Sequence, residues 1–321
     1  GSISQGASAV AMGYQAGRYN QATSAVAVGV AAGDTSQYFA AVAVGNEAGR
    51  YNQGSYAIAM GRAAGETSQG SSAVAVGYQA GQVSQGINSV AVGLSAGQTA
   101  QGSLSVAIGQ AAASTSQGRL ATAVGYAAGA ISQGSQATAV GQEAGYTGQG
   151  VAATAVGVNA GQTSQGGSAT AVGNYAGQTS QGSDAVAVGN QAGRYNQGAS
   201  AVAVGNLAGL SNQGGIAIGY SSGMYNQAGI AIGNYAGSNN QGNNSVAVGS
   251  TAGRYNQGIQ ATAIGHRAGE TSQGNYAIAI GDYAGFSNQH EKTIVLNATN
   301  TTLNTAQASS FYVKPVRGGN F

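Results

Sequence analysis

The residue types that most often carry out chemistry are scarce in this sequence. Its 321 residues include no Cys, two His and eight Asp and Glu. The missing thiols exclude disulfides, thiolate metal sites and Cys nucleophiles, and two imidazoles are too few for a His-rich metal site within one chain. His266 and Asp282 lie sixteen residues apart and form a His–carboxylate pair. Without a pocket and an orienting shell, such a pair is a solvated surface contact. We therefore predict no enzyme activity, no bound metal and no cofactor.

Recognition chemistry has better candidates, because several Tyr residues follow Arg and precede Asn. An exposed Tyr beside Arg and Asn can stack on a sugar ring while its neighbours bind the sugar hydroxyls. The alternative is that these Tyr rings stack on the protein itself and add stability without recognition. The candidate ligand-binding residues are Arg18, Tyr19, Arg50, Tyr51, Arg194, Tyr195, Arg254 and Tyr255.

A single repeat accounts for nearly the whole chain. Its core, Ala-Val-Ala-Val-Gly, begins at Ala9 and recurs every 16 residues to Ala201; two steps of 14 then lead to Gly215 and Gly229, and later steps of 16 end at Thr293, which makes 19 copies. We number the repeat A-V-A-V-G-x-x-A-G-x-x-x-Q-G-x-x as positions 1 to 16. One coil of this length cannot enclose a core, so successive coils must stack.

Alternation within the repeat core predicts a short β-strand at its start. Position 4 is always large and apolar, position 2 is Val, Ile or Thr, and position 3 is Ala in 18 of 19 copies. We expect the large face to be buried and the small face to be approached closely by another segment. Position 5 is Gly in 18 copies and Asn297 in the last, which predicts a corner with positive φ.

Stacked coils explain two further columns of the repeat. Position 13 is Gln in every complete copy, which predicts a ladder of amides or amides that satisfy corner backbone groups. Position 10 alternates in sign through Arg18, Asp34, Arg50 and Glu66, as expected if these side chains sit one coil apart. The structural ladder is represented by Gln53, Gln69, Gln85 and Gln101.

The two shortened copies, which begin at Ala201 and Gly215, lack only positions 15 and 16. We therefore predict that these two positions form an exposed bulge and that 14 residues make the minimal coil. At a strand spacing of roughly 4.8 Å, the eighteen steps predict a rod on the order of 85 Å long. We assign the repeats to residues 1–297 and a separate C-terminal segment to residues 298–321.

The strand is apolar on both faces, which is typical of a strand covered on both sides. A thin coil covers one face only, so we expect a homo-oligomer in which the other face meets a partner chain. Threefold symmetry is the natural closed solution, although the pattern leaves a dimer open. The sequence does not decide which face meets the axis.

Units such as Ser89-Val-Ala-Val-Gly93 and Ser105-Val-Ala-Ile-Gly109 resemble the head repeats of YadA-type trimeric autotransporter adhesins. The resemblance implies an all-β fold, a left-handed parallel β-roll of about 19 coils that forms a homotrimeric rod. The C-terminal stretch Phe311-Tyr-Val-Lys-Pro-Val-Arg317 is similar to the linker that precedes an endosialidase-type intramolecular chaperone in viral and phage-like tail fibres. That likeness implies a tail-fibre setting.

Charge and hydropathy limit the partners. The net charge is +2 without any run of Lys or Arg, which predicts no nucleic-acid partner. No apolar stretch approaches the roughly 18 residues of a membrane span, so we predict no membrane insertion.

Our leading functional hypothesis is a trimeric fibre or adhesin shaft, extracellular or on a virion surface, that attaches to a cell-surface glycan or protein receptor. The alternative is a structural spacer without a binding site of its own. An ice-binding solenoid ranks lower, because the Thr column at position 11 is interrupted by Tyr and Ile131.

Overall fold

The computed structural model describes residues 3–316, which form an all-β parallel solenoid of about 19 turns. The chain divides into two compact units, Gly1–Ser168 and Ala169–Phe321, which are described separately. Two kinds of strand recur in each unit. Strands at positions 2 to 4 form what we call the valine sheet, and strands at positions 11 to 13 form the glutamine sheet.

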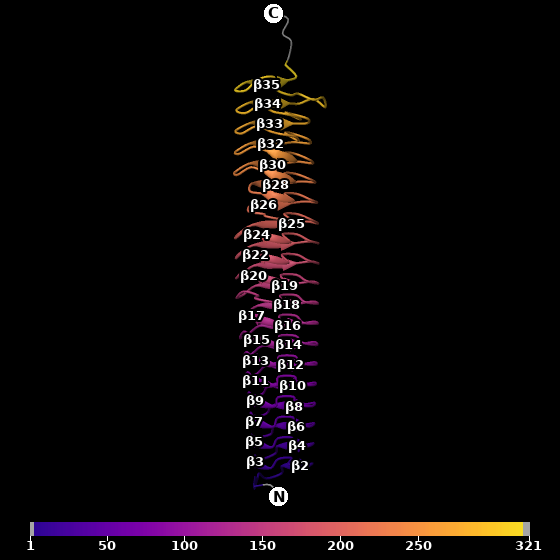
Figure 1. The fold of residues 1–321 in the computed structure, drawn as a ribbon, viewed down its shortest axis with the longest axis vertical. Coiled ribbons are helices and arrows are strands. Elements are labelled where there is room, and N and C mark those ends of the chain that lie inside the picture. Colours follow the sequence, from indigo (N-terminus) through magenta and orange to yellow (C-terminus); the bar gives the residue numbers. More distant parts are fainter. Residues whose placement is uncertain (1–2, 317–321) are drawn as a thin grey trace, which may run out of the picture. The chain divides into compact units, whose positions relative to one another are not determined.

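In the first unit, the strands of each sheet stack one coil above the next (Figure 1). Its valine sheet contains β2 (Val10–Met12), β4 (Val26–Val28), β6 (Val42–Val44), β8 (Ile58–Met60), β10 (Val74–Val76), β12 (Val90–Val92), β14 (Val106–Ile108), β16 (Thr122–Val124), β18 (Thr138–Val140) and β19 (Thr154–Val156). Its glutamine-sheet strands are β1 (Ile3–Gln5), β3 (Tyr19–Gln21), β5 (Thr35–Gln37), β7 (Tyr51–Gln53), β9 (Thr67–Gln69), β11 (Val83–Gln85), β13 (Thr99–Gln101), β15 (Thr115–Gln117), β17 (Ile131–Gln133) and β20 (Thr163–Gln165).

The second unit repeats this arrangement. Its valine sheet contains β21 (Thr170–Val172), β23 (Val186–Val188), β25 (Val202–Val204), β26 (Ile216–Ile218), β28 (Ile230–Ile232), β30 (Val246–Val248), β32 (Thr262–Ile264), β33 (Ile278–Gly281), β34 (Ile294–Asn297) and β35 (Phe311–Lys314). Its glutamine-sheet strands are β22 (Thr179–Gln181), β24 (Tyr195–Gln197), β27 (Tyr225–Gln227), β29 (Asn239–Gln241) and β31 (Tyr255–Gln257).

Pairing is parallel and joins identical positions of the repeat. Val74 of β10 pairs with Val90 of β12, and Val83 of β11 pairs with Thr99 of β13, each sixteen residues on. The predicted stack of coils and the predicted strand at the repeat core are therefore confirmed. The sequence reasoning did not predict the second strand, at positions 11 to 13.

The core of each coil is built from Ala and Gln. The predicted close approach to the small strand face is therefore confirmed, whereas the predicted burial of the large face was wrong. Ala73 and Ala75, at positions 1 and 3, are fully buried, as is Ala80 at position 8. Val74 and Val76, on the other face of the same strand, remain half-buried. The physical reason is the narrow width of the coil, which in this coil is filled by the Ala methyl groups and one Gln side chain. The small face meets the opposite wall of its own coil, and the large face points outward.

The corner at position 5 requires glycine for two reasons. Gly77 has φ of 130°, and a Cβ there would lie 2.6 Å from the carbonyl oxygen of Gly93 in the next coil. Asn297 departs from this expectation because it ends β34 as a strand residue without a positive φ. Its amide instead donates hydrogen bonds to the carbonyl oxygens of Asp282, at 2.7 Å, and Thr301, at 2.6 Å.

Three other positions of the coil adopt the left-handed region without glycine. In the first complete coil they are Gln15, Asn20 and Ser24, at positions 7, 12 and 16, with φ between 54° and 59°. Asn tolerates this region, whereas most side chains avoid it. The stacked ladders above and below hold these residues in place.

The shortened coils keep the core register. Val202 pairs with Ile216, and Ile216 pairs with Ile230, fourteen residues apart in each case. Positions 15 and 16 of full-length coils are turn residues, such as the exposed Asn243 and Asn244. The prediction of a removable surface bulge is thus confirmed.

The segment after the last repeat adds one more strand to the valine sheet. Ile294 of β34 pairs with Phe311 of β35, in parallel. Leu303 and Tyr312 pack against the buried Ala cluster at this end of the second unit. The terminal segment therefore covers the last coil.

Candidate functional site

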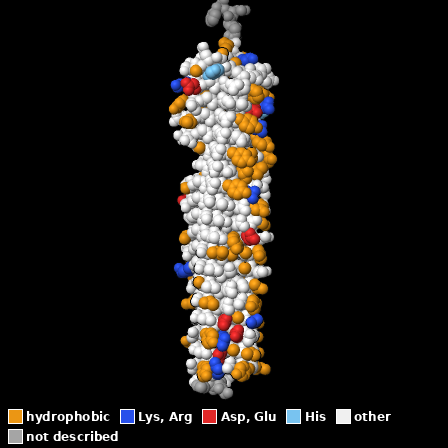
Figure 2. Space-filling model, viewed as in Figure 1, with side chains coloured by type: hydrophobic (Ala, Val, Ile, Leu, Met, Phe, Trp, Pro, Cys, Tyr) orange, Lys and Arg blue, Asp and Glu red, His pale blue; other side chains and the backbone are white. Residues whose placement is uncertain are grey.

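Large apolar side chains line the outward face of the valine sheet in each unit. Met60 of the first unit is 45% exposed, and Ile280 of the second is 40% exposed. Figure 2 shows hydrophobic side chains in patches between broad areas of uncharged polar side chains and backbone. Neighbouring coils repeat the pattern, so the exposed side chains adjoin one another and form contiguous apolar patches.

The candidate Arg–Tyr pairs lie on the glutamine-sheet side, where each guanidinium rests on the ring of the next residue. The distance from the Arg Cζ atom to the ring centroid is 4.6 Å for Arg18 and Tyr19, and 4.8 Å for Arg50 and Tyr51. In the second unit this distance is 4.7 Å for Arg194 and Tyr195, and 4.8 Å for Arg254 and Tyr255. Each sequence-predicted pair is therefore in contact.

Two of these Arg side chains also lie against a Tyr of the preceding coil. Arg194 is 4.6 Å from the ring of Tyr175, and Arg254 is 4.8 Å from the ring of Tyr235. Both Tyr residues stand at position 7, which the sequence reasoning did not single out. Aligning positions 7 and 10 of neighbouring coils would have revealed the pairing.

The guanidinium groups also form hydrogen bonds and ion pairs with polar side chains. Arg18 donates a hydrogen bond of 3.0 Å to Asp34, whose side chain is 1% exposed. Arg50 pairs at 3.2 Å with Glu47 of its own coil, and Arg254 lies 4.0 Å from Glu270. These Arg groups are tied into the coils, and each covers one face of the Tyr ring that follows it.

The predicted alternation of charge at position 10 holds for some coils. Asp34 and Arg18 pair across coils, whereas Arg50 turns to Glu47 at position 7 and Glu66 accepts a hydrogen bond of 2.8 Å from Gln82. Arg194 has no carboxylate in the next coil and donates to Gln178, at 2.7 Å, instead. The alternation is therefore one of several ways to satisfy this column.

Position 13 places a buried amide inside every coil. Gln53 donates to Oε1 of Gln69 at 3.1 Å, and Gln69 donates to Oε1 of Gln85 at the same distance. Each amide also donates to the carbonyl oxygen at position 2 of its own coil. These bonds are Gln53 to Val42 at 2.7 Å, Gln69 to Ile58 at 2.8 Å, Gln85 to Val74 at 2.8 Å and Gln101 to Val90 at 2.8 Å.

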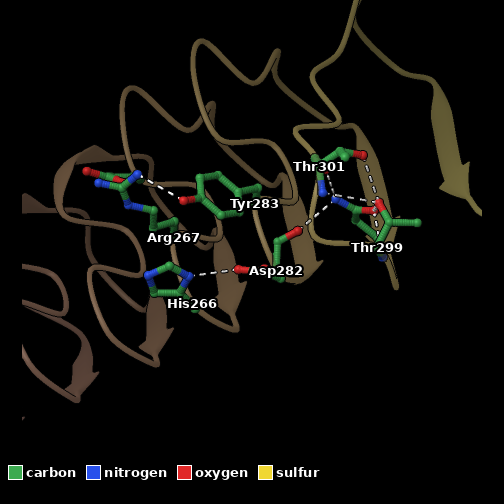
Figure 3. A network of polar contacts seen from close by, with 8 residues as sticks. His266, Arg267, Asp282, Tyr283, Thr299 and Thr301 are labelled. Carbon is green, nitrogen blue, oxygen red and sulfur yellow. Dashed lines mark hydrogen bonds and ion pairs between the residues drawn. The ribbon is translucent and has the colours of Figure 1, made fainter.

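A polar network lies near the end of the second unit (Figure 3). His266 Nδ1 is 2.8 Å from Asp282 Oδ1, which confirms the predicted surface contact. Both side chains are substantially exposed, at 50% and 38%. Arg267 donates to the hydroxyl of Tyr283 at 3.1 Å, and this bond, followed by the charge of Glu270, raises the pKa of Arg267.

An open hollow of about 720 Å³ adjoins this network and is lined by Ile280, Asp282, Asn297, Thr299 and Lys314, among others. The ring of Tyr283 meets the imidazole of His266 edge to face, with centroids 5.4 Å apart. The pair is exposed, and the hollow that Asp282 lines is open to solvent.

Two Tyr rings of neighbouring coils are also in contact. The rings of Tyr220 and Tyr235 meet edge to face with centroids 5.2 Å apart. The pKa of Tyr235 is raised, chiefly by its hydrogen bond to Tyr220.

Among residues 3–316, no three His, Asp or Glu side chains gather in a way that could hold a metal ion. No helix long and apolar enough to cross a membrane occurs within the same residues.

Comparison of this chain with protein-family models, with curated proteins and with solved structures finds no match.

Proposed function

We propose that this chain is a non-enzymatic segment of an extracellular or virion-surface fibre, in which three copies cover one another's valine sheets. The observation that carries the proposal is the outward row of half-exposed Val, Ile and Met side chains in each unit. Burying a Val or Ile side chain fully contributes roughly 1.5–3 kcal/mol. A face with such a side chain in every coil is therefore stabilised when a partner covers it.

The repeat itself favours a second copy of this chain as that partner. An identical chain offers the same row of apolar positions at the same spacing, which no unrelated surface would match over so many coils. Three copies around one axis agree with the resemblance of the repeats to YadA-type heads. The glutamine sheets would then face outward.

The outward surface is the proposed attachment surface, with the exposed Tyr rings as its anchors and a glycan or a protein receptor as its ligand. The alternative, a structural spacer, draws support from a specific observation. The guanidinium groups of Arg18, Arg50, Arg194 and Arg254 are already engaged by Tyr, acidic or amide side chains.

The mass of the chain in solution tests the assembly. We expect light scattering at several concentrations to give close to three times the chain mass of 31.0 kDa. A stable monomer at micromolar concentration would contradict the proposal, and a mass of two chains would replace the trimer with a dimer built on the same face.

The attachment role is tested separately with a glycan array. We expect the parent protein to bind, and a Tyr19→Ala/Tyr51→Ala variant to bind more weakly if those rings are anchors. Binding to no ligand in a broad set would favour the spacer.

A further inference from the structure

Five exposed asparagines form a continuous amide ladder on the second unit. They stand at position 12 of consecutive coils. Asn196 donates to Asn212 at 3.2 Å, Asn212 to Asn226 at 3.2 Å, Asn226 to Asn240 at 2.9 Å, and Asn240 to Asn256 at 3.1 Å. Each donor is the Nδ2 atom and each acceptor the Oδ1 atom of the next residue.

The ladder leaves half of each amide free for a ligand. A side-chain amide has two N–H donors and an oxygen that accepts two hydrogen bonds. The ladder uses one donor and one acceptor site of each inner residue, so a donor and an acceptor remain on each exposed side chain. The result is a row of fixed, outward-facing amides at the strand spacing of about 4.8 Å.

The coil does not require these asparagines. Position 12 adopts the left-handed region throughout, and Ser fills it at Ser36, Ser68 and Ser84 with φ between 56° and 58°. Ser therefore satisfies the backbone in equivalent coils of the first unit. The uninterrupted run of Asn adds hydrogen-bonding capacity that the fold itself does not need.

Aromatic rings flank the ladder at every second coil. Tyr195, Tyr225 and Tyr255 stand at position 11, each next to an asparagine of the ladder, and are 37%, 40% and 36% exposed. Parallel bridges through Ser211 join Tyr195 to Tyr225, and Asn239 pairs with both Tyr225 and Tyr255. Successive rings are therefore two strand spacings apart, about 9.6 Å.

The two shortened coils lie in the middle of this surface. Residues 201–214 and 215–228 lack the bulge at positions 15 and 16, which directly follows the glutamine sheet. A hollow of about 300 Å³ lies at the deletion, but its lining includes Ile216, Ile230 and Val246 of the valine sheet and no residue of the ladder. The ladder residues Asn212 and Asn226 belong to these two coils. The bulge is therefore absent beside the centre of the ladder.

We propose that this surface, the track from Tyr195 to Asn256, binds an extended, β-1,4-linked linear polysaccharide that runs along the stack of coils. In such a chain alternate sugars face the same way, and its two-sugar repeat is close to twice the strand spacing. Alternate sugar rings stack on Tyr225 and on the faces of Tyr195 and Tyr255 opposite their guanidinium groups. The free amide groups bind the hydroxyls between them. The inference deepens the proposed attachment role and relies on it only for the outward position of the glutamine sheet.

Binding is measured by calorimetry with cellohexaose and chitohexaose, and with the α-1,4-linked, coiled maltohexaose for comparison. We expect the parent chain to bind at least one of the two β-linked probes and to bind maltohexaose at least about tenfold more weakly. Absence of binding to both β-linked probes would overturn the inference.

Two variants use residues that the repeat itself places at these positions, which protects the fold. One is Asn212→Ser/Asn226→Ser/Asn240→Ser, and the other is Tyr195→Thr/Tyr225→Thr/Tyr255→Thr. We expect each to weaken binding by about tenfold or more, because stacking and paired hydrogen bonds are each lost at three places. The matched control, Val83→Thr at position 11 of the first unit, also replaces an exposed position-11 side chain by Thr and should bind as the parent does.

The solution mass of every sample separates this inference from the proposed assembly. A monomeric parent that binds cellohexaose or chitohexaose supports the track while contradicting the trimer. A trimeric parent that binds neither overturns the track alone, as do track variants that retain parental affinity.

Discussion

At the scale of single residues, the buried amide at position 13 explains why the repeat keeps Gln so strictly. Gln69 donates to the carbonyl oxygen of Ile58 within its coil and to the amide of Gln85 in the next. A buried carbonyl without a donor costs about 1–3 kcal/mol. The Gly at position 9 leaves room for this amide, because a Cβ at Gly65 would lie 2.8 Å from the side chain of Gln69.

We expect Gln69→Leu to lower the free energy of unfolding by about 1–3 kcal/mol, because it leaves buried polar groups unpaired. Urea denaturation followed by circular dichroism measures the change. Ser71→Ala, at an exposed turn position of the same coil, is the control and should unfold as the parent does. Equal stability of all three proteins would show that the amide ladder contributes nothing.

Ala113 offers the reverse test, because it is an Ala at position 9 with φ of 47°. Left-handed backbone costs a residue with a Cβ roughly 1–2 kcal/mol, and glycine removes this strain. Up to about 1 kcal/mol of the gain is offset, because glycine loses more conformational entropy on folding. We expect Ala113→Gly to raise the free energy of unfolding by up to about 1 kcal/mol. A loss of stability in the same denaturation assay would contradict this account of position 9.

At the scale of the coil, the corner at position 5 sets how closely successive coils approach. We expect Gly77→Ala to lower the free energy of unfolding by more than about 1–3 kcal/mol, because backbone strain adds to the clash with Gly93. Thermal unfolding measures the effect. Gly148→Ser is the matched control, since its Cβ would lie 3.9 Å from the nearest atom and Ser is common at position 12. Comparable losses in both variants would refute the corner argument.

Much of the coil could be predicted from the repeat, and the failures have definite causes. The columns gave the register, the Gly corner and the amide at position 13, because stacking aligns equivalent residues. The sequence did not show which strand face points into the coil, since Ala and Val are both apolar and only the width of the coil decides between them. The left-handed residues at positions 7 and 16 also escaped notice, because Tyr175 or Ala40 carries no local signal for positive φ.

The candidate site was predictable only in part. The Arg–Tyr pairs are adjacent in sequence, so their contact followed from the triplet. The additional rings of Tyr175 and Tyr235 come from the preceding coil, and the Asn ladder depends on how side chains of one column orient toward each other. Aligning positions 7 and 10 of neighbouring coils would have revealed the first, whereas the second could not be derived without the three-dimensional structure.

At the scale of the whole molecule, the surface composition explains why association is the expected behaviour. The sequence has ten Lys and Arg and eight Asp and Glu among 321 residues, so few charges protect the apolar valine face from association. A face of this kind is stable in water when another surface covers it. The glutamine sheet presents mainly Asn, Ser, Thr and Tyr and has no comparable need for a partner.

A charge on the valine face should therefore dissociate the proposed assembly without unfolding the coil. We expect Val92→Asp and Val188→Asp, one in each unit, to reduce the solution mass toward one chain, because both side chains are half-buried in the chain alone and a carboxylate in an apolar interface costs several kcal/mol. The parent melting temperature should rise with protein concentration, since assembly stabilises by mass action, and the variants should lose that dependence. Ser71→Asp and Ser183→Asp place the same charge on exposed turns and should keep the parental mass. If the valine-face variants also keep it, the interface lies elsewhere on the coil.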